Sequence, residues 1–336
     1  MKIGKVPNKL LYELVLKKMK TSDDRVLMSA GVGEDFGVLD FGGDCCIVSG
    51  DPITGATKHA GRMAVYVACN DIATCGVRPV ALLSTLLLPP GTSEAELGAL
   101  ADEIAAAADN LGVSVIGGHT EVTDAVNRIV ISVTAIGAAK RGAYVKTGGA
   151  AAGDVLVMTK SAGLEGTAII ASEREAEVLA RFGRAFTDAA RSLAADISVV
   201  DEGVIAGGYG VSAMHDATEG GIYGAAWEMA EASGRGIVID KDCIRVHDIT
   251  RDLCGFFGVD AYRLISSGSM LIATDKPAGL ITLLENAGIQ AVKIAVFTEN
   301  PNERFILEGG ERTVLDQPGP DELYNINYLK RRIVRD

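Results

Sequence analysis

Acidic residues stand beside glycines and other small residues at five places along the chain. They occur in the segments Gly31-Val32-Gly33-Glu34-Asp35, Ser49-Gly50-Asp51-Pro52, Asn70-Asp71, Gly117-Gly118-His119-Thr120-Glu121 and His215-Asp216-Ala217-Thr218-Glu219-Gly220-Gly221. Grouped carboxylates repel one another unless a cation neutralises them, and Mg²⁺ prefers a few carboxylates together with phosphates and water. The pattern therefore indicates a hard cation and a polyphosphate.

Asp71 gives the strongest single signal among these carboxylates. It is the only charged residue between positions 63 and 77, and a helix there places it on the same face as Ala64 and Val67. A carboxylate on an apolar helix face is costly unless it is paired or bound to a metal. Taken alone, the other acidic segments also fit turns, and Asp216 or Thr218 also fits a helix N-cap.

Two further loops are rich in small residues and could cradle phosphate oxygens with their N–H groups. They span residues 159–167, which include Lys160, and residues 266–269. The chain has no G-x-x-x-x-G-K-[ST], no G-x-G-x-x-G, no H-E-x-x-H and no kinase catalytic loop. His119 has no second His or Cys at zinc-ligand spacing, so a zinc site is not expected.

The composition is that of a soluble globular protein with a sizeable core. A length of 336 residues predicts about two domains, and the net charge of −12 argues against nucleic acid or an anionic membrane as the main partner. The 40 glycines exceed the roughly 24 expected from a share of about 7%. We expect many tight loops in which the backbone approaches another group closely.

Targeting and redox signals favour the cytoplasm. The first 20 residues carry several lysines and no apolar run long enough for a secretory signal. The longest apolar run, at residues 80–90, is too short for a membrane helix. The six cysteines form no C-x-x-C pair, which predicts buried, reduced thiols.

Periodicity and turn residues predict an α+β protein of two domains, with a boundary in the small, flexible stretch at 146–153. The predicted domains span residues 1–148 and 149–336, with a polar, partly mobile tail from about 320. In the first domain we expect helices at 10–20, 57–76 and 94–111, the last capped by Ser93 and Glu96. Strands are expected there at 36–41, 45–50, 79–88, 113–117 and 129–138.

In the second domain the same signals predict strands at 154–159, 211–215, 269–274, 291–298 and 303–308. Helices are expected over about 165–206, at 220–233 and at 277–287. The acidic segments therefore fall at the ends of strands or at the starts of helices, where side chains from separate elements can meet.

The ordered set of Gly33-Glu34-Asp35, Asp51-Pro52, Asn70-Asp71-Ile72-Ala73, Gly117-Gly118-His119-Thr120 and His215–Gly221 resembles the AIR synthase superfamily, also called PurM-like. The resemblance covers residues 25–310 and is nearest to the HypE-like, AIR synthase-related branch. It implies an N-terminal domain that pairs with its twin, so that strands of two subunits close a β-barrel. It also implies an α/β C-terminal domain, with ATP and Mg²⁺ in a cleft near the dimer interface.

The resemblance also implies the site residues. Asp35, Asp51, Asp71 and Asp216 would be metal ligands, and Asp51, Asp71 and Asp216 would be catalytic. The nucleotide-binding residues would be Gly33, Asp35, Asn70, Gly117, Gly118, His119, Thr120, Glu121, Lys160 and Glu219. Many family members carry Asp or Glu where His119 stands, so Glu121 is expected to supply that carboxylate.

The implied chemistry is transfer of the ATP γ-phosphate to an amide or acid oxygen of a small or protein-bound acceptor, with hydrogenase maturation as one setting. HypE proteins end in a reactive cysteine, whereas no cysteine follows Cys254 here, so that reaction is not expected on this terminus. Three alternatives stay open: a kinase of the thiamine-monophosphate kinase type, AIR synthase itself, and a nucleotide-binding maturation scaffold without turnover. In each case we expect a cytoplasmic homodimer.

Overall fold

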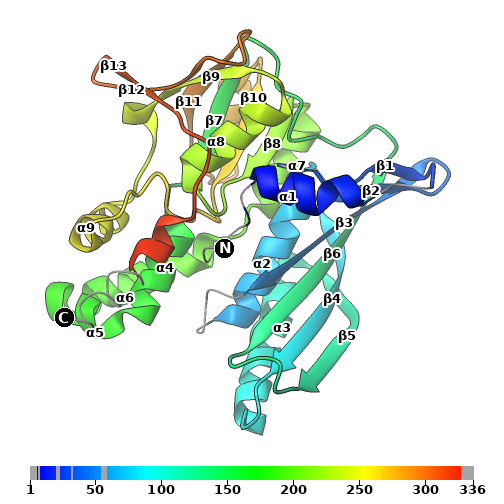
Figure 1. The fold of residues 1–336 in the computed structure, drawn as a ribbon, viewed down its shortest axis with the longest axis vertical. Coiled ribbons are helices and arrows are strands. Elements are labelled where there is room, and N and C mark those ends of the chain that lie inside the picture. The colour runs from blue at the N-terminus through cyan, green and yellow to red at the C-terminus, as the bar shows by residue number, and fades with distance from the viewer. Residues whose placement is uncertain (1–5, 7, 20–22, 32, 54–58, 327–336) are drawn as a thin grey trace.

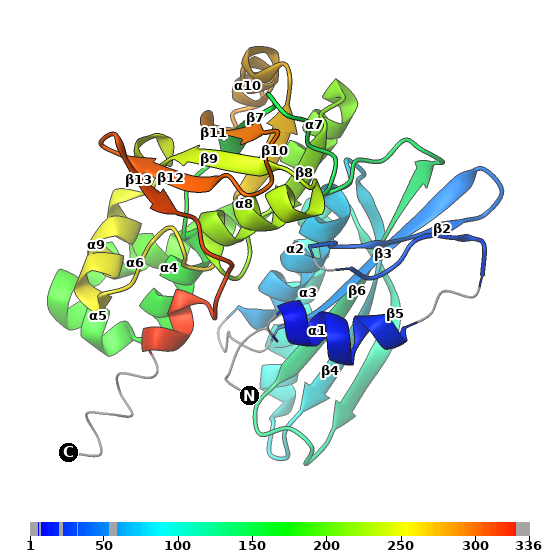
Figure 2. The ribbon, with the colours of Figure 1, turned by 45° about the horizontal axis from the view of Figure 1, so that its top comes forward.

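The computed structural model describes residues 6, 8–19, 23–31, 33–53 and 59–326. Two β-sheets lie side by side, each with its own helices, so the α+β prediction is confirmed (Figures 1 and 2). The strands of the first sheet come from residues 26–140 and those of the second from residues 155–314. The chain crosses between the sheets over residues 141–154, and the predicted domain boundary within this stretch stays a prediction.

The first sheet has six strands in the order β1-β2-β3-β6-β4-β5. Neighbours are antiparallel except β4 and β5, which are parallel because helix α3 crosses between them. The strands are β1 (Val26–Met28), β2 (Gly37–Asp40), β3 (Asp44–Ile53), β4 (Pro79–Leu88), β5 (Ser114–Val122) and β6 (Val130–Lys140). The short helices α1 (Asn8–Leu14) and η1 (Leu16–Lys18) precede this sheet and bury no residue.

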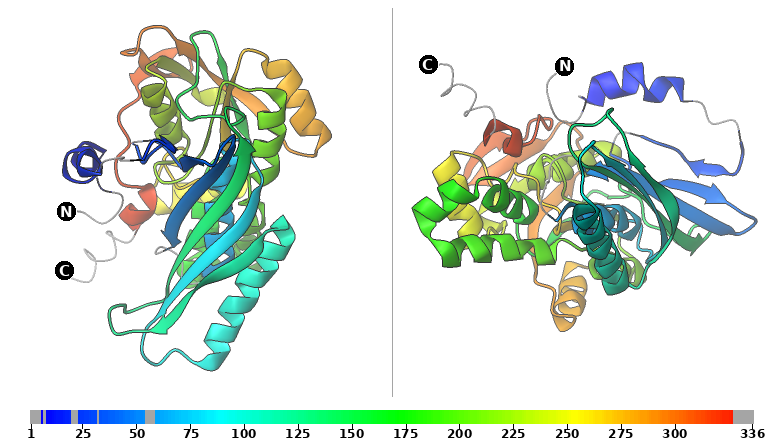
Figure 3. Two further views of the ribbon diagram at one scale, coloured as in Figure 1. Left: turned by 90° about the vertical axis from the view of Figure 1, so that its right-hand side faces the viewer. Right: turned by 90° about the horizontal axis from the view of Figure 1, so that it is seen from below.

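Helices α2 (Ala60–Ala73) and α3 (Glu94–Leu111) cover one face of this sheet (Figure 3). Alternate residues of β3 and β6, such as Ile47 and Val133, are buried on that face. Helix α3 has the predicted bounds, because Ser93 Oγ accepts from the Glu96 N–H and the Glu96 carboxylate accepts from the Ser93 N–H.

The second sheet has seven strands in the order β13-β12-β9-β11-β7-β10-β8. They are β7 (Val155–Thr159), β8 (Ala213–Asp216), β9 (Gly236–Asp240), β10 (Met270–Thr274), β11 (Ala291–Thr298), β12 (Arg304–Glu308) and β13 (Glu311–Val314). Both faces of its central strands are covered. On β10, Ile272 belongs to the core beneath α7 (Val200–Tyr209) and α10 (Pro277–Asn286), whereas Leu271 belongs to the core beneath α8 (Gly221–Ala232).

The first core cluster runs without a break from α2 into the face of the second sheet beneath α7 and α10. Helix α2 therefore packs on its own sheet with one side and on α7 with the other. A third cluster holds together α4 (Leu164–Glu173), α5 (Glu175–Phe182), α6 (Arg184–Ser192) and α9 (Asp248–Phe257). The short helices η2 (Leu193–Asp196) and η3 (Lys241–Cys243) follow α6 and β9.

Two sequence-based expectations are corrected. The strand expected at 113–117 continues to Val122, so the Gly117–Glu121 segment lies in a strand and not in a loop. The predicted mobile tail is docked at its beginning, because Ile326 is buried in the helical cluster and Arg174 Nη1 donates to its carbonyl. The rest of that tail, from residue 327, and the expected start of the 57–76 helix lie outside the described residues.

Five of the described elements were not predicted: β1, β9, η3, α9 and β13. Strands β1 and β13 are short strands at the edges of the sheets, β9 is an internal strand of five residues, η3 has three residues, and α9 belongs to the third core cluster. Within the described part of the chain, no helix combines the length and the apolar character needed to cross a membrane.

Candidate metal and nucleotide site

Asp71 lies at the base of a group of carboxylates. Its side chain is 4% exposed on α2, as expected from its position on the apolar helix face. Burial raises its pKa well above the ordinary value, and the negative charges of Asp216, Asp51 and Asp35 raise it further. Three of the strongest charge effects on Asp71 thus come from the other carboxylates that the sequence had singled out.

Strand β3 supplies the polar surroundings of Asp71. Ser49, in the middle of this strand, donates a hydrogen bond of 2.5 Å from Oγ to Asp71 Oδ2, which lowers the pKa of Asp71 but does not offset burial. Asp51, two residues later, is exposed. The group therefore has a buried end at Asp71 and an open end at Asp51, from which a charged ligand can enter.

Asp35 and His215 join the two halves of the protein. Asp35 follows Gly33, whose φ of +77° needs a glycine, and precedes β2. His215 lies near the end of β8, with Nδ1 at 2.8 Å from Asp35 Oδ2 and Nε2 at 3.1 Å from Glu228 Oε2 on α8. Burial alone lowers the pKa of His215, but Asp35 and Glu228 together outweigh it and raise this pKa well above its ordinary value.

The chemistry of this group fits a hard divalent cation. Single ligand atoms of Asp35, His215 and Asp216 lie within 4.8 Å of one another. Both ring nitrogens of His215 face carboxylates, so the ring is placed to orient Asp35 and the oxygens are the available ligands. Asp216 is 1% exposed, and a bound cation would stabilise a buried carboxylate near Asp71.

A double glycine lies where the chain turns from β8 into α8. Gly220, the N-cap of α8, and Gly221, its first residue, have φ values of +88° and +64°. A Cβ on Gly221 would lie 2.5 Å from the Tyr262 carbonyl, so the turn must pass close to that loop. Within the turn, Glu219 Oε1 accepts from the Tyr324 hydroxyl at 3.0 Å, which ties this predicted nucleotide-binding residue to the docked C-terminal segment.

Asn70 connects the two halves. It is fully buried beside Asp71, its amide donates to the Ile197 carbonyl at 2.9 Å, and its oxygen accepts from the Val199 N–H at 2.8 Å. Both partners belong to the segment between η2 and α7. These two hydrogen bonds hold that segment beside α2.

Lys160 contacts the same segment from the second sheet. It has a φ of +51°, and its Nζ donates to the carbonyls of Asp196 at 3.0 Å and Ser198 at 2.6 Å. It also forms an ion pair of 2.7 Å with the buried Glu202. Contacts with two carbonyls and one carboxylate match the three donors of an ammonium group. A nucleotide that binds Lys160 as predicted would therefore compete with these partners for its ammonium group.

The β5 residues lie apart from the carboxylates within one chain. Register places Gly118 beside Ser84, Ser84 beside Val133, and Val133 beside Asp51, so Gly118 and Asp51 share one row of the sheet. Three strand spacings separate them, or about 14 Å. His119 and Glu121 are exposed and face each other at 3.1 Å, while Gly117 and Thr120 are their exposed neighbours in the strand.

Gly118 also has a steric reason to be glycine. A Cβ there would lie 1.9 Å from the Ser84 carbonyl oxygen, and its φ is +149°. No L side chain fits this position without moving β4. The second glycine of the pair that suggested a ligand loop is thus required by the packing of two parallel strands.

His215 and Glu228 were not identified as site residues from the sequence. His215 stands next to Asp216, so its neighbour was a signal, but histidine beside an acidic residue is compatible with many roles. Glu228 lies within α8 and has no motif around it. Only the packing of α8 against β8 places its carboxylate on the His215 ring.

Two family models match the chain. The N-terminal domain model of AIR synthase related protein matches residues 33–139, and the C-terminal domain model matches residues 151–308. The first match leaves out the edge strand β1 of the first sheet, and the second leaves out the edge strand β13 of the second sheet.

Known proteins with related sequences include a putative hydrogenase expression/formation protein of Methanocaldococcus jannaschii. It is 29% identical over 282 residues, which cover 81% of each chain. Carbamoyl dehydratase HypE of Escherichia coli is 26% identical over 294 residues, covering 86% of this chain and 84% of that protein.

The fold is also found in a solved structure of the hydrogenase maturation protein HypE in complex with ATP. The TM-score is 0.68 at 19% identity, and the match covers 94% of this chain and 95% of that chain.

Proposed function

This chain belongs to the AIR synthase-related family, and we propose that it is an ATP-dependent enzyme. We propose that it binds Mg²⁺ and ATP at the carboxylates of Asp35, Asp51, Asp71 and Asp216. The supporting observation is the burial of Asp71 near Asp35, Asp51 and Asp216, since a bound cation would offset the mutual repulsion of these carboxylates. A hydrogenase maturation protein HypE of this fold forms a complex with ATP, which supports the nucleotide.

The four carboxylates have different roles in the proposed site. Asp71 and Asp216 are the buried ligands, Asp51 is the ligand at the open end, and Asp35 is oriented by His215. Ser49 fixes the Asp71 carboxylate through its short hydrogen bond. A bound Mg²⁺ would neutralise phosphate oxygens, and positioning by these side chains accounts for most of the catalysis in phosphoryl transfer.

The proposed reaction activates an oxygen of the acceptor. The oxygen of a carboxamide attacks the γ-phosphorus, the bond to the β-γ bridging oxygen breaks, and ADP leaves. Loss of phosphate and of the amide protons then gives a nitrile, so that an amide and ATP yield a nitrile, ADP, phosphate and a proton. The similarity to a carbamoyl dehydratase supports an amide acceptor.

The homodimer belongs to the same proposal. Strand β5 is exposed along its whole length at the edge of the first sheet, and apolar side chains such as Ile116 and Val122 are 62% and 61% exposed. An open, apolar edge strand invites pairing with another chain. Pairing through β5 would bring the His119 and Glu121 side chains of one chain toward its twin.

The site is tested by calorimetric titration of Mg·ATP into the intact chain and into Asp71→Asn and Asp216→Asn. We expect at least tenfold weaker binding in both variants, and unchanged binding in Asp102→Asn, which alters an exposed carboxylate on α3. Melting temperatures measured without metal verify that each variant is folded. Unchanged Mg·ATP affinity in both site variants would reject the assignment.

The acceptor is tested by measuring ADP release with a panel of acceptors. Release that depends on a carboxamide supports the dehydratase proposal. Release with thiamine monophosphate and no amide would instead identify a small-molecule kinase, and binding of ATP with no release for any acceptor would favour the scaffold alternative.

A further inference from the structure

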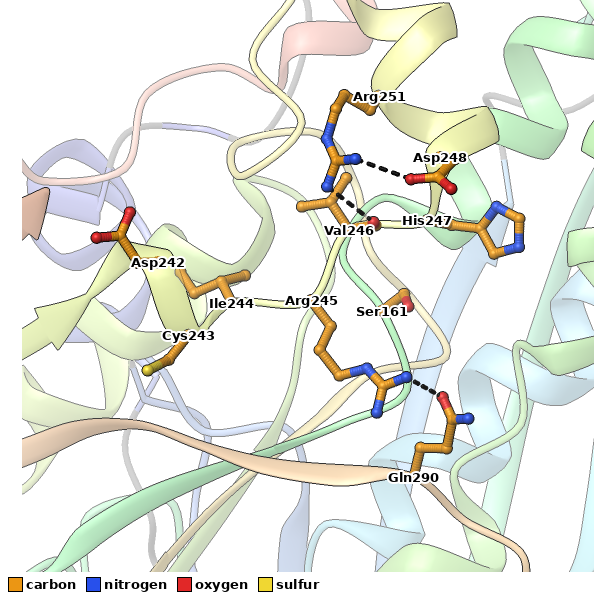
Figure 4. A pocket seen from close by; sticks show the side chains of 10 residues that line it. All are labelled: Ser161, Asp242, Cys243, Ile244, Arg245, Val246, His247, Asp248, Arg251 and Gln290. Carbon is orange, nitrogen blue, oxygen red and sulfur yellow. Dashed lines mark hydrogen bonds and ion pairs between the residues drawn. The ribbon is translucent and has the colours of Figure 1, made fainter. Parts of the chain in front are cut away.

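The second sheet carries a pocket that the proposed nucleotide site does not use. Its volume is about 420 Å³, and it is lined by residues 242–248, by Arg251, and by Ser161 and Gln290 (Figure 4). The lining residues come from the segment after β9, the start of α9, the end of β7 and the approach to β11. Four elements thus converge on one concave surface.

The pocket lies on the same edge of the sheet as Asp216. Register pairs Asp216 with Met270, and Thr159 with Ala291, while the Met270 N–H donates to Thr159 Oγ1. Ser161 lies two residues after Thr159, and Gln290 directly precedes Ala291. The strand order β11-β7-β10-β8 therefore separates the two places by about 10–14 Å.

The two arginines of the pocket have different partners. Arg251 donates from Nη1 to Asp248 at 2.8 Å and from Nη2 to the Val246 carbonyl at 3.3 Å, so its charge is neutralised locally. Arg245 is half-buried, and its side chain donates to the Gln290 amide oxygen. Among the described residues, no carboxylate forms an ion pair with Arg245.

The surroundings of Arg245 favour a compact anion. Figure 4 shows its guanidinium beside Gln290 at one end of the pocket, with Ser161 nearby and Asp242 at the other end. A half-buried guanidinium without a carboxylate has several donors in a planar fork, which matches a carboxylate or a phosphate. Asp242 disfavours a second negative charge at the far end, so a long polyanion does not fit.

We propose that this pocket binds a small ligand with one anionic end, a carboxylate or a phosphate monoester, through the Arg245 guanidinium. Arg245 and Gln290 hold the anion, and the rest of the ligand extends toward Asp242 and carries hydroxyl or amino groups there. The proposal does not depend on the proposed Mg²⁺ and ATP site, because the pocket contains none of Asp35, Asp51, Asp71 and Asp216.

The experiment measures anion binding in the intact chain without metal or nucleotide. Arginine Nε–H signals are followed by NMR during titration with inorganic phosphate, glycerol phosphate and succinate, and the Arg245 signal is assigned from Arg245→Gln. We expect saturable shifts of that signal with at least one of the three probes. A response to both phosphates identifies a phosphate ligand, and a response to succinate identifies a carboxylate ligand.

Variants connect this binding to the guanidinium. Arg245→Gln should weaken it at least tenfold, Arg245→Lys should weaken it less, and the charge-matched control Arg312→Gln on the exposed strand β13 should leave it unchanged. Melting temperatures verify that each variant is folded. The proposal is overturned if no probe shifts the Arg245 signal, or if Arg245→Gln and Arg312→Gln bind the probes equally well.

Discussion

His215 Nδ1 lies 2.8 Å from Asp35 Oδ2, so a strand of the second sheet holds a carboxylate that comes from the first. The ring also contacts Glu228, and all three side chains are at most 14% exposed. Two charged partners around one buried imidazole make this the main polar contact between the sheets at the site.

His215→Leu should therefore destabilise the protein strongly. The change leaves Asp35 and Glu228 beside each other without a cation, and breaking a buried pair costs about 3–5 kcal/mol. Urea unfolding at pH 7 measures this loss. The double variant His215→Leu/Glu228→Gln should recover part of it, because one of the two carboxylates is then neutral. A loss below about 1 kcal/mol in the single variant would contradict the assigned charge on His215.

Asn70→Ala should loosen the contact between α2 and the segment before α7. Two buried hydrogen bonds disappear, and the Ile197 carbonyl and the Val199 N–H lose their partner. Each orphaned buried group costs about 1–3 kcal/mol, so we expect a total of roughly 2–6 kcal/mol in urea unfolding. Asn286→Ala, at the exposed end of α10, is the control and should change stability by less than about 0.5 kcal/mol.

The stability of the protein should fall between about pH 4.5 and pH 7 because of Glu165. Burial raises the pKa of this carboxyl, which lies beside Ser267 at the start of α4, from 4.5 to about 7. Within this window the unfolded chain is ionised and the folded chain still holds the proton, so unfolding becomes more favourable as the pH rises. The expected loss is about 3 kcal/mol, complete once the pH exceeds the folded pKa.

Glu165→Gln tests this pH dependence, because the glutamine does not ionise. Unfolding free energies at pH 4.5, 6 and 8 should fall less in this variant than in the unchanged chain, whereas Glu285→Gln on α10, exposed to solvent, should keep the original slope. Parallel curves for all three proteins would show that Glu165 ionises normally.

Ile116→Asp should prevent dimerisation. Ile116 lies in the middle of the exposed edge strand β5, and a charge on such an edge blocks pairing with another strand. Light scattering at micromolar concentration should give twice the chain mass for the unchanged protein and the single mass for the variant. Val314→Asp is the matched control, since Val314 is 61% exposed on the edge strand β13 of the other sheet. A monomeric unchanged protein would contradict the proposed dimer.

Local patterns determined much of the fold and part of the site. The capping box at Ser93 and Glu96 fixed the start of α3, because it depends on contacts three residues apart. Asp71 is the single charge on an apolar helix face, which predicted its burial. This pattern too depends only on residues that are close in sequence. The alternating and apolar runs that predicted β4 and β11 with their observed bounds are likewise properties of short segments.

Contacts between distant segments were decided only by the tertiary structure. Nothing near Glu228 or Asp35 indicates that one imidazole lies between them, since 180 residues separate Asp35 from His215. The nucleotide contacts expected of Asn70 and Lys160 stay predictions. Both side chains donate to carbonyls of residues 196–198, which the packing of α7 on α2 brings there. A side chain's partner depends on which strands and helices meet, and that is set by the whole core rather than by the neighbours in sequence.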